Sequence, residues 1–245
     1  MCTIYKNKVK WVISEDFITK IKKSLKTDSD EKAGVLLFED NKDDCKGNVC
    51  NKKSTKFKIN NGNGSSVFTP HGVINFHTHP KTAYEGQDAK YGWPSGEDMA
   101  QTIEFAKKNN LVHIVFTLEG AYVINVKKII LKKDNKILES VLKQTHKFRS
   151  SNQTKQYSNF KEFLQDVIKS NKRTTVNLWL DLINSLSLKL LYTLYNKHNN
   201  KKLKIPDDDD KIFDVKLIKL KNNLTFSANF VEEACHLKSF GEKSY

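Results

Sequence analysis

The sequence has few of the residues that define low-complexity chains or disulfide-stapled scaffolds. Its 245 residues include only ten glycines and four prolines, which excludes a collagen-like or proline-rich chain. The four cysteines stand at positions 2, 45, 50 and 235. Cys45 and Cys50 could form a disulfide or half of a metal site, but no second pair lies nearby to close a structural zinc site. Free thiols in a reducing compartment are the default expectation.

Long apolar segments are also absent. The first six residues contain no apolar signal core. The most apolar stretch, residues 175–195, is interrupted by Asn177, Asp181 and Lys189, which favours a buried helix over a membrane span. We therefore expect a non-secreted protein without a membrane partner, in the cytoplasm or elsewhere inside the cell (the host cytoplasm if the chain is viral).

Acidic residues are outnumbered, 28 against 42 lysines and arginines, which gives a net charge of +14. Such a balance is compatible with nucleic-acid binding. The lysines, however, are scattered from Lys6 to Lys243, and no basic run alternates with aromatics as on a base-stacking surface. Frequent lysine, asparagine and isoleucine are typical of an AT-rich genome, such as that of a large DNA virus or a microbe. Solvated faces are the favoured interpretation, and nucleic-acid binding by the basic C-terminal half stays an alternative.

The apolar pattern changes along the chain. Up to residue 127, periods typical of helices and strands alternate, which indicates an α/β class. The expected elements there are helices over 14–25 and from Ser95 to about 108, and strands over 33–38, 56–59, 72–76, 112–118 and 121–126. Residues 39–53 are polar and predict a long loop. Helical spacing then follows over 137–148, 160–168 and 176–195, with a strand over 212–220. We expect a domain over 1–130 and a mostly helical extension over 131–245.

One group of residues has the composition and spacing of a catalytic metal site. His77 and His79 stand two apart at the end of an expected strand, so both side chains point to the same face. Pro80 stops the strand, because it has no N–H for the ladder. Asp98 lies in the first turn of the next helix and can add a carboxylate oxygen. Two histidines and one aspartate leave a fourth tetrahedral position open, which is the pattern of a catalytic zinc site.

Each part of this constellation also has a simpler interpretation. Two histidines near a strand end can be ordinary surface residues, and Ser95 with Asp98 is a common capping box at a helix start. The combination is more specific than its parts, because the histidine pair and the carboxylate come in the order that a metal site needs. Trp93 and Pro94 also fix the approach to the helix.

These motifs resemble those of the JAMM (MPN+) metalloproteases. That family has an upstream glutamate, then His-x-His-Pro, then Trp-Pro-Ser-x-x-Asp. Here the glutamate is Glu31, which precedes an apolar strand in a Glu-x-x-Gly setting with Gly34. The resemblance covers roughly residues 11–126, about half of the chain, and does not extend to the C-terminal half.

The resemblance implies a fold, a metal and an activity. The fold would be a cytidine-deaminase-like mixed sheet flanked by helices. His77, His79 and Asp98 would bind Zn²⁺, Glu31 would act as general base and then acid, and Ser95 would help to stabilise the oxyanion. The substrates would be conjugates of ubiquitin or a ubiquitin-like modifier, cut at an isopeptide or peptide bond. Inactive members of the family serve as scaffolds in larger assemblies, so a non-catalytic MPN-like scaffold is the main alternative.

The spacing departs from the family between Pro80 and Trp93. Residues 81–92 form an insert longer than usual. We expect a loop over the site that shapes access or binds substrate; the alternative is that Glu85 or Asp88 approaches the metal. Should Glu31 not be the base, Glu39 is the reserve candidate. His71 and His113 are expected to be structural.

Overall fold

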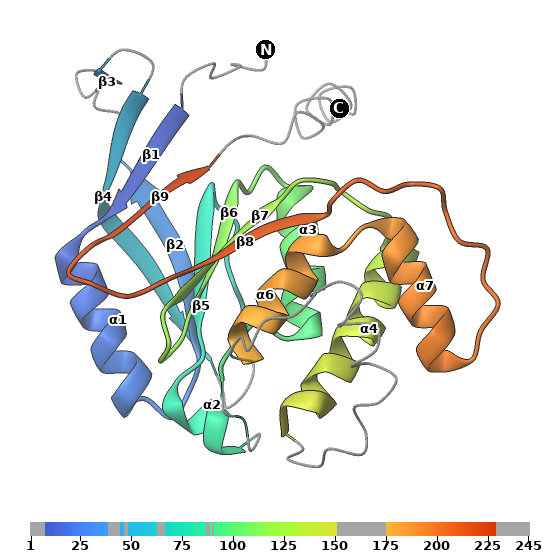
Figure 1. Ribbon diagram of the computed structural model, residues 1–245. Coiled ribbons are helices and arrows are strands. Elements are labelled where there is room, and N and C mark those ends of the chain that lie inside the picture. The colour runs from blue at the N-terminus through green and yellow to red at the C-terminus, as the bar shows by residue number, and fades with distance from the viewer. Residues whose placement is uncertain are drawn as a thin grey trace, which may run out of the picture.

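The computed structural model describes residues 8–38, 45–46, 49–62, 67–86, 89, 91–150 and 175–228 (Figure 1). The chain forms one mixed nine-stranded sheet with helices on both faces, so the expected α/β class is confirmed. The strands are β1 (Lys8–Ile13), β2 (Lys32–Phe38), β3 (Cys45–Lys46), β4 (Val49–Asn61), β5 (Ile74–Thr78), β6 (Val112–Phe116), β7 (Ala121–Val126), β8 (Phe213–Ile218) and β9 (Leu224–Ala228). The helices are α1 (Glu15–Thr27), α2 (Lys81–Gly86), α3 (Gly96–Ala106), α4 (Lys132–Ser150), α6 (Thr175–Ser185) and α7 (Leu188–Asn199).

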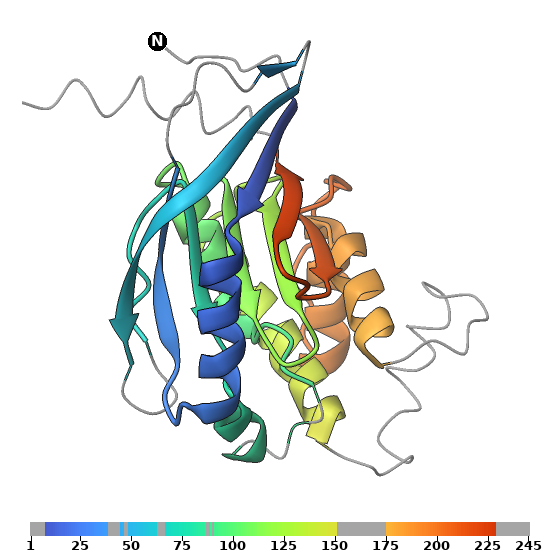
Figure 2. The ribbon, with the colours of Figure 1, turned by 90° about the vertical axis from the view of Figure 1, so that its left-hand side faces the viewer.

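The sheet curls, and two strands that follow each other in the chain form its two ends. Its order is β8-β7-β6-β5-β2-β4-β1-β9, and β3 pairs only with β4. β8 and β9 are therefore at opposite ends of the sheet although residues 219–223 join them directly. Only β1 with β4 and β5 with β6 run parallel; the other pairs are antiparallel. The curled sheet wraps around α1 (Figure 2).

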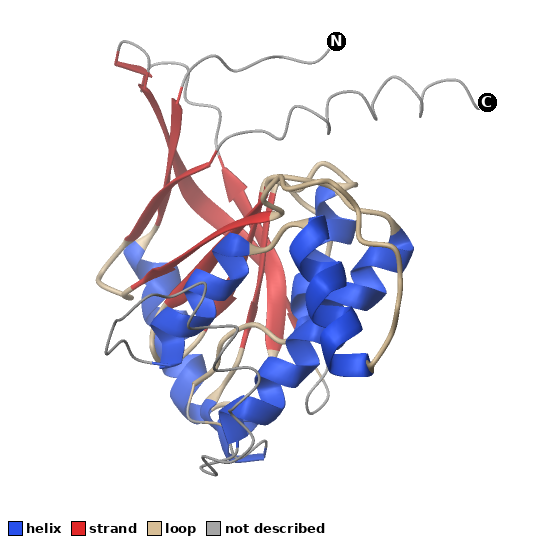
Figure 3. Cartoon of the chain, turned by 45° about the vertical axis from the view of Figure 1, so that its right-hand side comes forward, coloured by secondary structure: helices blue, strands red, loops and turns tan. Residues whose placement is uncertain are grey.

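Of the helices that the structure describes, α1 lies in the concave face, while α3, α4, α6 and α7 cover the other face (Figures 1 and 3). The apolar side of α1 recurs at helical spacing, and Phe17, Ile18 and Ile21 are at most 1% exposed. Phe17 packs edge-on against Phe76 and Phe116, with ring centroids 5.1 Å and 5.8 Å apart. This packing anchors the central strands β5 and β6 from the side opposite the candidate site.

The second core lies between the sheet and the other helices. It includes Met99 and Ile103 of α3, Leu138 of α4 and Trp179 of α6. Because both faces are covered, all five residues of β5 are buried. The site-bearing strand is therefore held in a rigid environment on both sides.

Two expectations about the elements were wrong. The polar stretch 39–53 is not a continuous loop, because β3 and the start of β4 lie within it and pair antiparallel. The helical pattern over 176–195 is two helices, because the chain bends at Leu186 and Ser187. The Ser187 hydroxyl accepts from the Leu190 N–H at 3.3 Å and so caps α7. The helix expected over 160–168 lies outside the described residues.

The expected division at residue 130 does not separate two sheets or two cores in the described residues. Beyond it the chain is helical through α7, as expected, but β8 then pairs with β7, and β9 pairs with β1. Within the described ranges, none of the helices is both long and apolar enough to cross a membrane.

Candidate metal centre

The end of β5 places the two histidines. Strand alternation sends Ile74 and Phe76 into the α1 core and turns His77 to the face covered by α3. His79 follows the strand, and its backbone N–H donates to the Phe116 carbonyl at 2.8 Å, which holds the chain beside β6. The Nε2 atoms of His77 and His79 then lie 3.0 Å apart. The predicted convergence of the two imidazoles is present.

Asp98 joins them from the first turn of α3. Its Oδ1 lies 3.4 Å from His77 Nε2, and its Oδ2 lies 3.5 Å from His79 Nε2. Asp98 also completes a capping box, because Ser95 N–H donates to Asp98 Oδ2 at 2.7 Å and Asp98 N–H donates to Ser95 Oγ at 3.1 Å. The cap and the ligand set are therefore not alternatives: the cap fixes the carboxylate that faces the histidines.

Aromatic stacking fixes the approach to α3. Trp93 is 3% exposed and stacks on Trp179 of α6 at 5.9 Å, with the rings 10° apart. Tyr91 also stacks with Trp93, with ring centroids 5.9 Å apart. The C-terminal half thus supports the segment that carries Ser95.

Glu31 reaches the site through the register of β2 against β5. Ala33 pairs with His77, so Glu31 lies two residues further along, toward His79. The Glu31 carbonyl accepts from the Gly62 N–H at 2.8 Å, and the neighbouring Lys32 N–H donates to Thr78 Oγ1 at 2.9 Å. Glu31 is only 8% exposed, and burial raises its pKa to about 7.

Close packing around β2 requires a glycine at position 34. A Cβ at this position would lie 2.0 Å from the Lys58 carbonyl oxygen of β4 and 2.7 Å from the Phe76 ring. Glycine therefore allows β2 to sit close to β4 and over Phe76. The close packing keeps β2, and with it Glu31, next to β5.

The electrostatics of the three residues favour a cation. Burial lowers the pKa of His77 to about 4. Burial opposes charge on His79 too, but the hydrogen bond and charge of Asp98 raise the pKa of His79 overall. Burial alone would raise the pKa of Asp98, yet His77 and His79 hold it well below its usual range. An ionised carboxylate therefore faces two imidazoles.

The donor set fits a zinc ion. The ligand atoms of His77, His79 and Asp98 all lie within 4.8 Å of one another, so one cation can reach all three. Imidazole nitrogen and carboxylate oxygen are both ordinary zinc ligands, and three protein ligands leave one position open. Without a cation, the two Nε2 atoms at 3.0 Å must share a proton or repel each other. The structure therefore has a group that could hold a metal at the predicted residues.

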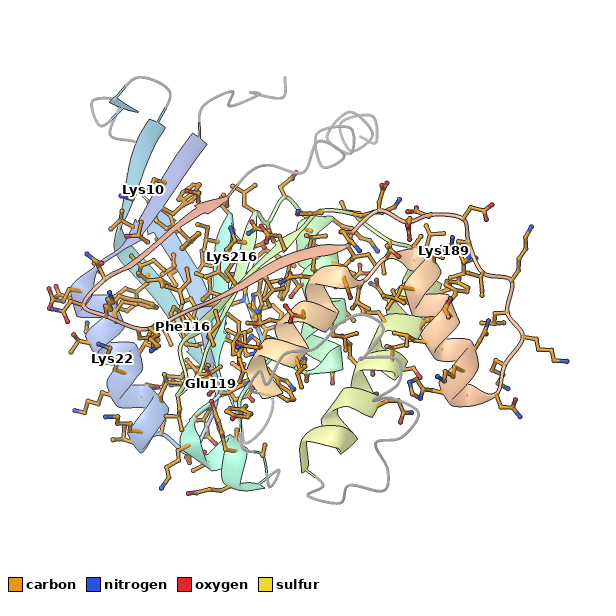
Figure 4. The ribbon with its side chains drawn as sticks, viewed as in Figure 1. Lys10, Lys22, Phe116, Glu119, Lys189 and Lys216 are labelled. Carbon is orange, nitrogen blue, oxygen red and sulfur yellow. The ribbon has the colours of Figure 1, made fainter. Side chains whose placement is uncertain are left out.

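The insert is tied to the site through Glu119, at the turn between β6 and β7 (Figure 4). The Tyr84 hydroxyl of α2 donates to Glu119 Oε2 at 2.5 Å, and the Gly92 N–H donates to Glu119 Oε1 at 2.6 Å. The Gly92 carbonyl in turn lies 2.7 Å from His79 Nδ1. The end of the insert therefore orients a ligand side chain.

Of the two acidic residues of the insert, Glu85 is the one that the structure describes, and it does not join the donor group. Glu85 forms an exposed pair with Lys81 at 3.1 Å. Asp88 lies outside the described residues, as does the reserve base Glu39.

The expectation that His113 is only structural misses a contact: its Nε2 lies 2.8 Å from His77 Nδ1. A buried histidine in an otherwise apolar strand, beside the strand that carries the ligands, was the available signal.

Comparison with known proteins adds little to this geometry. No protein-family model matches the chain, and no solved structure matches it. A stretch of 64 residues, 26% of this chain, is 34% identical to "Uncharacterized protein 3R" of Frog virus 3 (isolate Goorha). That stretch spans 14% of the length of the viral protein.

Proposed function

We propose that the protein is a zinc-dependent hydrolase of the JAMM (MPN+) type, which cleaves isopeptide or peptide bonds at the C-terminus of ubiquitin or a ubiquitin-like modifier. The supporting observation is the convergence of His77, His79 and Asp98 on one point, with the buried carboxyl of Glu31 beside them. The order of these residues along the chain is that of the JAMM motifs, and the mixed sheet between helices is compatible with such a fold.

His77, His79 and Asp98 would hold the metal. Zinc supplies a Lewis acid in such a site, which makes water a nucleophile near neutral pH and polarises a carbonyl group. The protein's own part is to fix the three ligands before the metal binds. Strand β5, the Gly92 carbonyl and the α3 cap each orient one of them.

Glu31 handles the proton. Its carboxylate accepts a proton from the attacking water, and the resulting carboxylic acid donates it to the amine that leaves as the C–N bond breaks. A carboxyl with its pKa near the working pH is suited to both steps, and burial gives Glu31 a pKa of about 7.

Ser95 stabilises the charge that develops on the carbonyl oxygen. Its Oγ accepts a hydrogen bond from Asp98 N–H, which leaves the hydroxyl proton for a substrate. A donor at a developing oxyanion typically contributes about 2.7–4 kcal/mol. Ser95 would thus serve both as helix cap and as oxyanion donor.

A cleavage assay tests this function. The zinc-loaded protein is incubated with a panel of diubiquitins of different linkage, and we expect cleavage that a chelator abolishes and added zinc restores. Glu31→Gln should keep zinc while the rate falls about 10²–10⁴-fold, because an amide cannot accept the proton. Glu15→Gln is the control, since Glu15 is exposed at the start of α1, on the face of the sheet opposite the candidate site.

Two outcomes would redirect the proposal. If the zinc-loaded protein cleaves no modifier, the scaffold alternative gains support. If the protein instead binds nucleic acid with an affinity that falls steeply with salt, the basic surface is the functional one. A wild-type rate in Glu31→Gln would remove Glu31 from the mechanism.

A further inference from the structure

A chain of buried polar side chains leads away from the candidate metal centre. His77 Nδ1 lies 2.8 Å from His113 Nε2, and His113 Nδ1 lies 2.8 Å from Asn75 Oδ1. Asn110 Nδ2 donates to the same Asn75 oxygen at 2.9 Å. Asn75 and His113 are at most 1% exposed, and Asn110 is 7% exposed. None of these three residues belongs to the ligand set.

Strand register creates this chain. β5 and β6 run parallel, and Asn75 pairs with His113. Paired residues of neighbouring strands share a face, and His77 shares it too because it stands two residues after Asn75. His113 therefore lies against His77, with ring centroids 4.9 Å apart and the ring planes only 26° apart.

The backbone fixes the direction of the hydrogen bonds. Asn75 Nδ2 donates to the Pro70 carbonyl at 3.2 Å, and Asn110 Nδ2 also donates to the Gly72 carbonyl at 2.8 Å. Backbone carbonyls can only accept, so both amide groups are oriented and Asn75 Oδ1 faces His113. A carbonyl oxygen cannot donate, so the proton between it and His113 must be on His113 Nδ1.

The tautomer of His77 follows, because a neutral imidazole carries a proton on one of its two ring nitrogens and a lone pair on the other. With its proton on Nδ1, His113 offers the lone pair of Nε2, so His77 must donate from Nδ1. The Nε2 of His77 then carries a lone pair, and it is this atom that faces His79 and Asp98. The opposite tautomer would direct an N–H into the ligand set and exclude a cation.

We propose that His113 is a positioning residue, which holds His77 in the one tautomer and ring orientation that can bind the metal. The inference rests on the proposed metal site. Groups that orient a metal-bound histidine through its other nitrogen typically change metal affinity about 10–100-fold when they are removed. His79 has its own orienting group in the Gly92 carbonyl, so the relay acts on His77 alone.

The experiment compares three variants of the full chain. His113→Leu fills similar space but offers no acceptor to His77 Nδ1, whereas the side-chain oxygen of His113→Gln can accept from it. Ile114→Ala changes the neighbouring residue of β6, which is buried in the α1 core on the other face. Zinc affinity is measured by competition with a chromophoric chelator, the unfolding midpoint by urea titration, and the His77 tautomer by ring ¹⁵N spectra of chelator-treated protein.

We expect His113→Leu to bind zinc about 10–100-fold more weakly than wild type and His113→Gln to regain most of the loss. Ile114→Ala should lower the unfolding midpoint without a matching loss of zinc affinity, which separates positioning from general destabilisation. Wild-type zinc affinity in His113→Leu would overturn the proposal. If the wild type binds no zinc, the proposed function fails, and the tautomer alone decides: a proton on His77 Nδ1 supports the relay, and a proton on Nε2 overturns it.

Discussion

Glu31 carries a cost in stability that can be measured apart from activity. Burial raises its pKa from 4.5 to about 7, so the folded chain binds this proton more tightly than the unfolded chain. The stability that comes from the neutral carboxyl is present below about pH 4.5, is lost progressively as the pH rises toward 7, and is absent above. The shift corresponds to at most about 3 kcal/mol.

Glu31→Gln should therefore stabilise the chelator-treated protein above about pH 7, by up to about 3 kcal/mol, and by much less near about pH 5. Urea unfolding at the two pH values measures the difference. Glu85→Gln should show no such pH-dependent gain, because Glu85 is exposed. Equal stability of Glu31→Gln and wild type at both pH values would show that the carboxyl is solvated in the folded protein.

Single residues could be predicted where their order along the chain carries the information. His77, His79 and Asp98 were identified from spacing within a strand and from the start of a helix, and the structure brings them together. Asn75 and Asn110 could not be connected to the site in this way. Their contacts depend on the parallel register of β5 and β6, which no local pattern encodes.

At the scale of elements, β2 tests whether its close packing is required. Gly34→Ala would place a Cβ against the Lys58 carbonyl oxygen and the Phe76 ring, so β2 or β4 must shift. We expect a loss of about 1–3 kcal/mol or more in the free energy of unfolding. Gly86→Ala, at the end of α2, is the matched control, because a Cβ there meets nothing within 4 Å. Similar unfolding free energies for both variants would contradict this packing.

The insert is a second test at this scale. Tyr84→Phe removes the hydroxyl that donates to Glu119 and accepts from the Leu118 N–H at 2.9 Å. The end of α2 should then loosen, and we expect a change in KM for a modifier substrate larger than the change in zinc content. The variant leaves the Gly92 contacts to Glu119 and His79 in place. A loss of zinc in proportion to activity would mean that the insert supports the metal directly.

Elements with a clear apolar period were predicted well, whereas β1 and the first part of β4 were not. α1 has a clear apolar side, and β6 and β7 flank an evident turn, so their positions followed from the sequence. β1 is as long as β7 but was not predicted, and its place in the sheet depends on pairing with β4 and β9, which are distant in sequence. β4 begins within a polar stretch, and its strand structure depends on pairing with β1 and β2, which are distant in sequence.

At the scale of the whole molecule, the two halves share one sheet and contribute to both of its cores. Val115, Tyr122 and Ile124 of the first half pack in the same cluster as Trp179 and Leu182 of the second. A fragment of residues 1–130 would expose that face and would lack β9, which pairs with β1, and β8, which pairs with β7. We expect the fragment not to unfold cooperatively in urea, monitored by circular dichroism, whereas the full chain gives one transition. A cooperative transition of the fragment would support the division at residue 130.

The metal content of the purified protein tests the central claim most directly. Elemental analysis of the gel-filtered protein, expressed with zinc in the medium, should find one zinc per chain. The double variant His77→Ala/His79→Ala should be folded and hold essentially none, because a site with three protein ligands cannot lose both imidazoles. Full zinc occupancy in the double variant, or a wild type that stays without zinc after loading, would contradict the account.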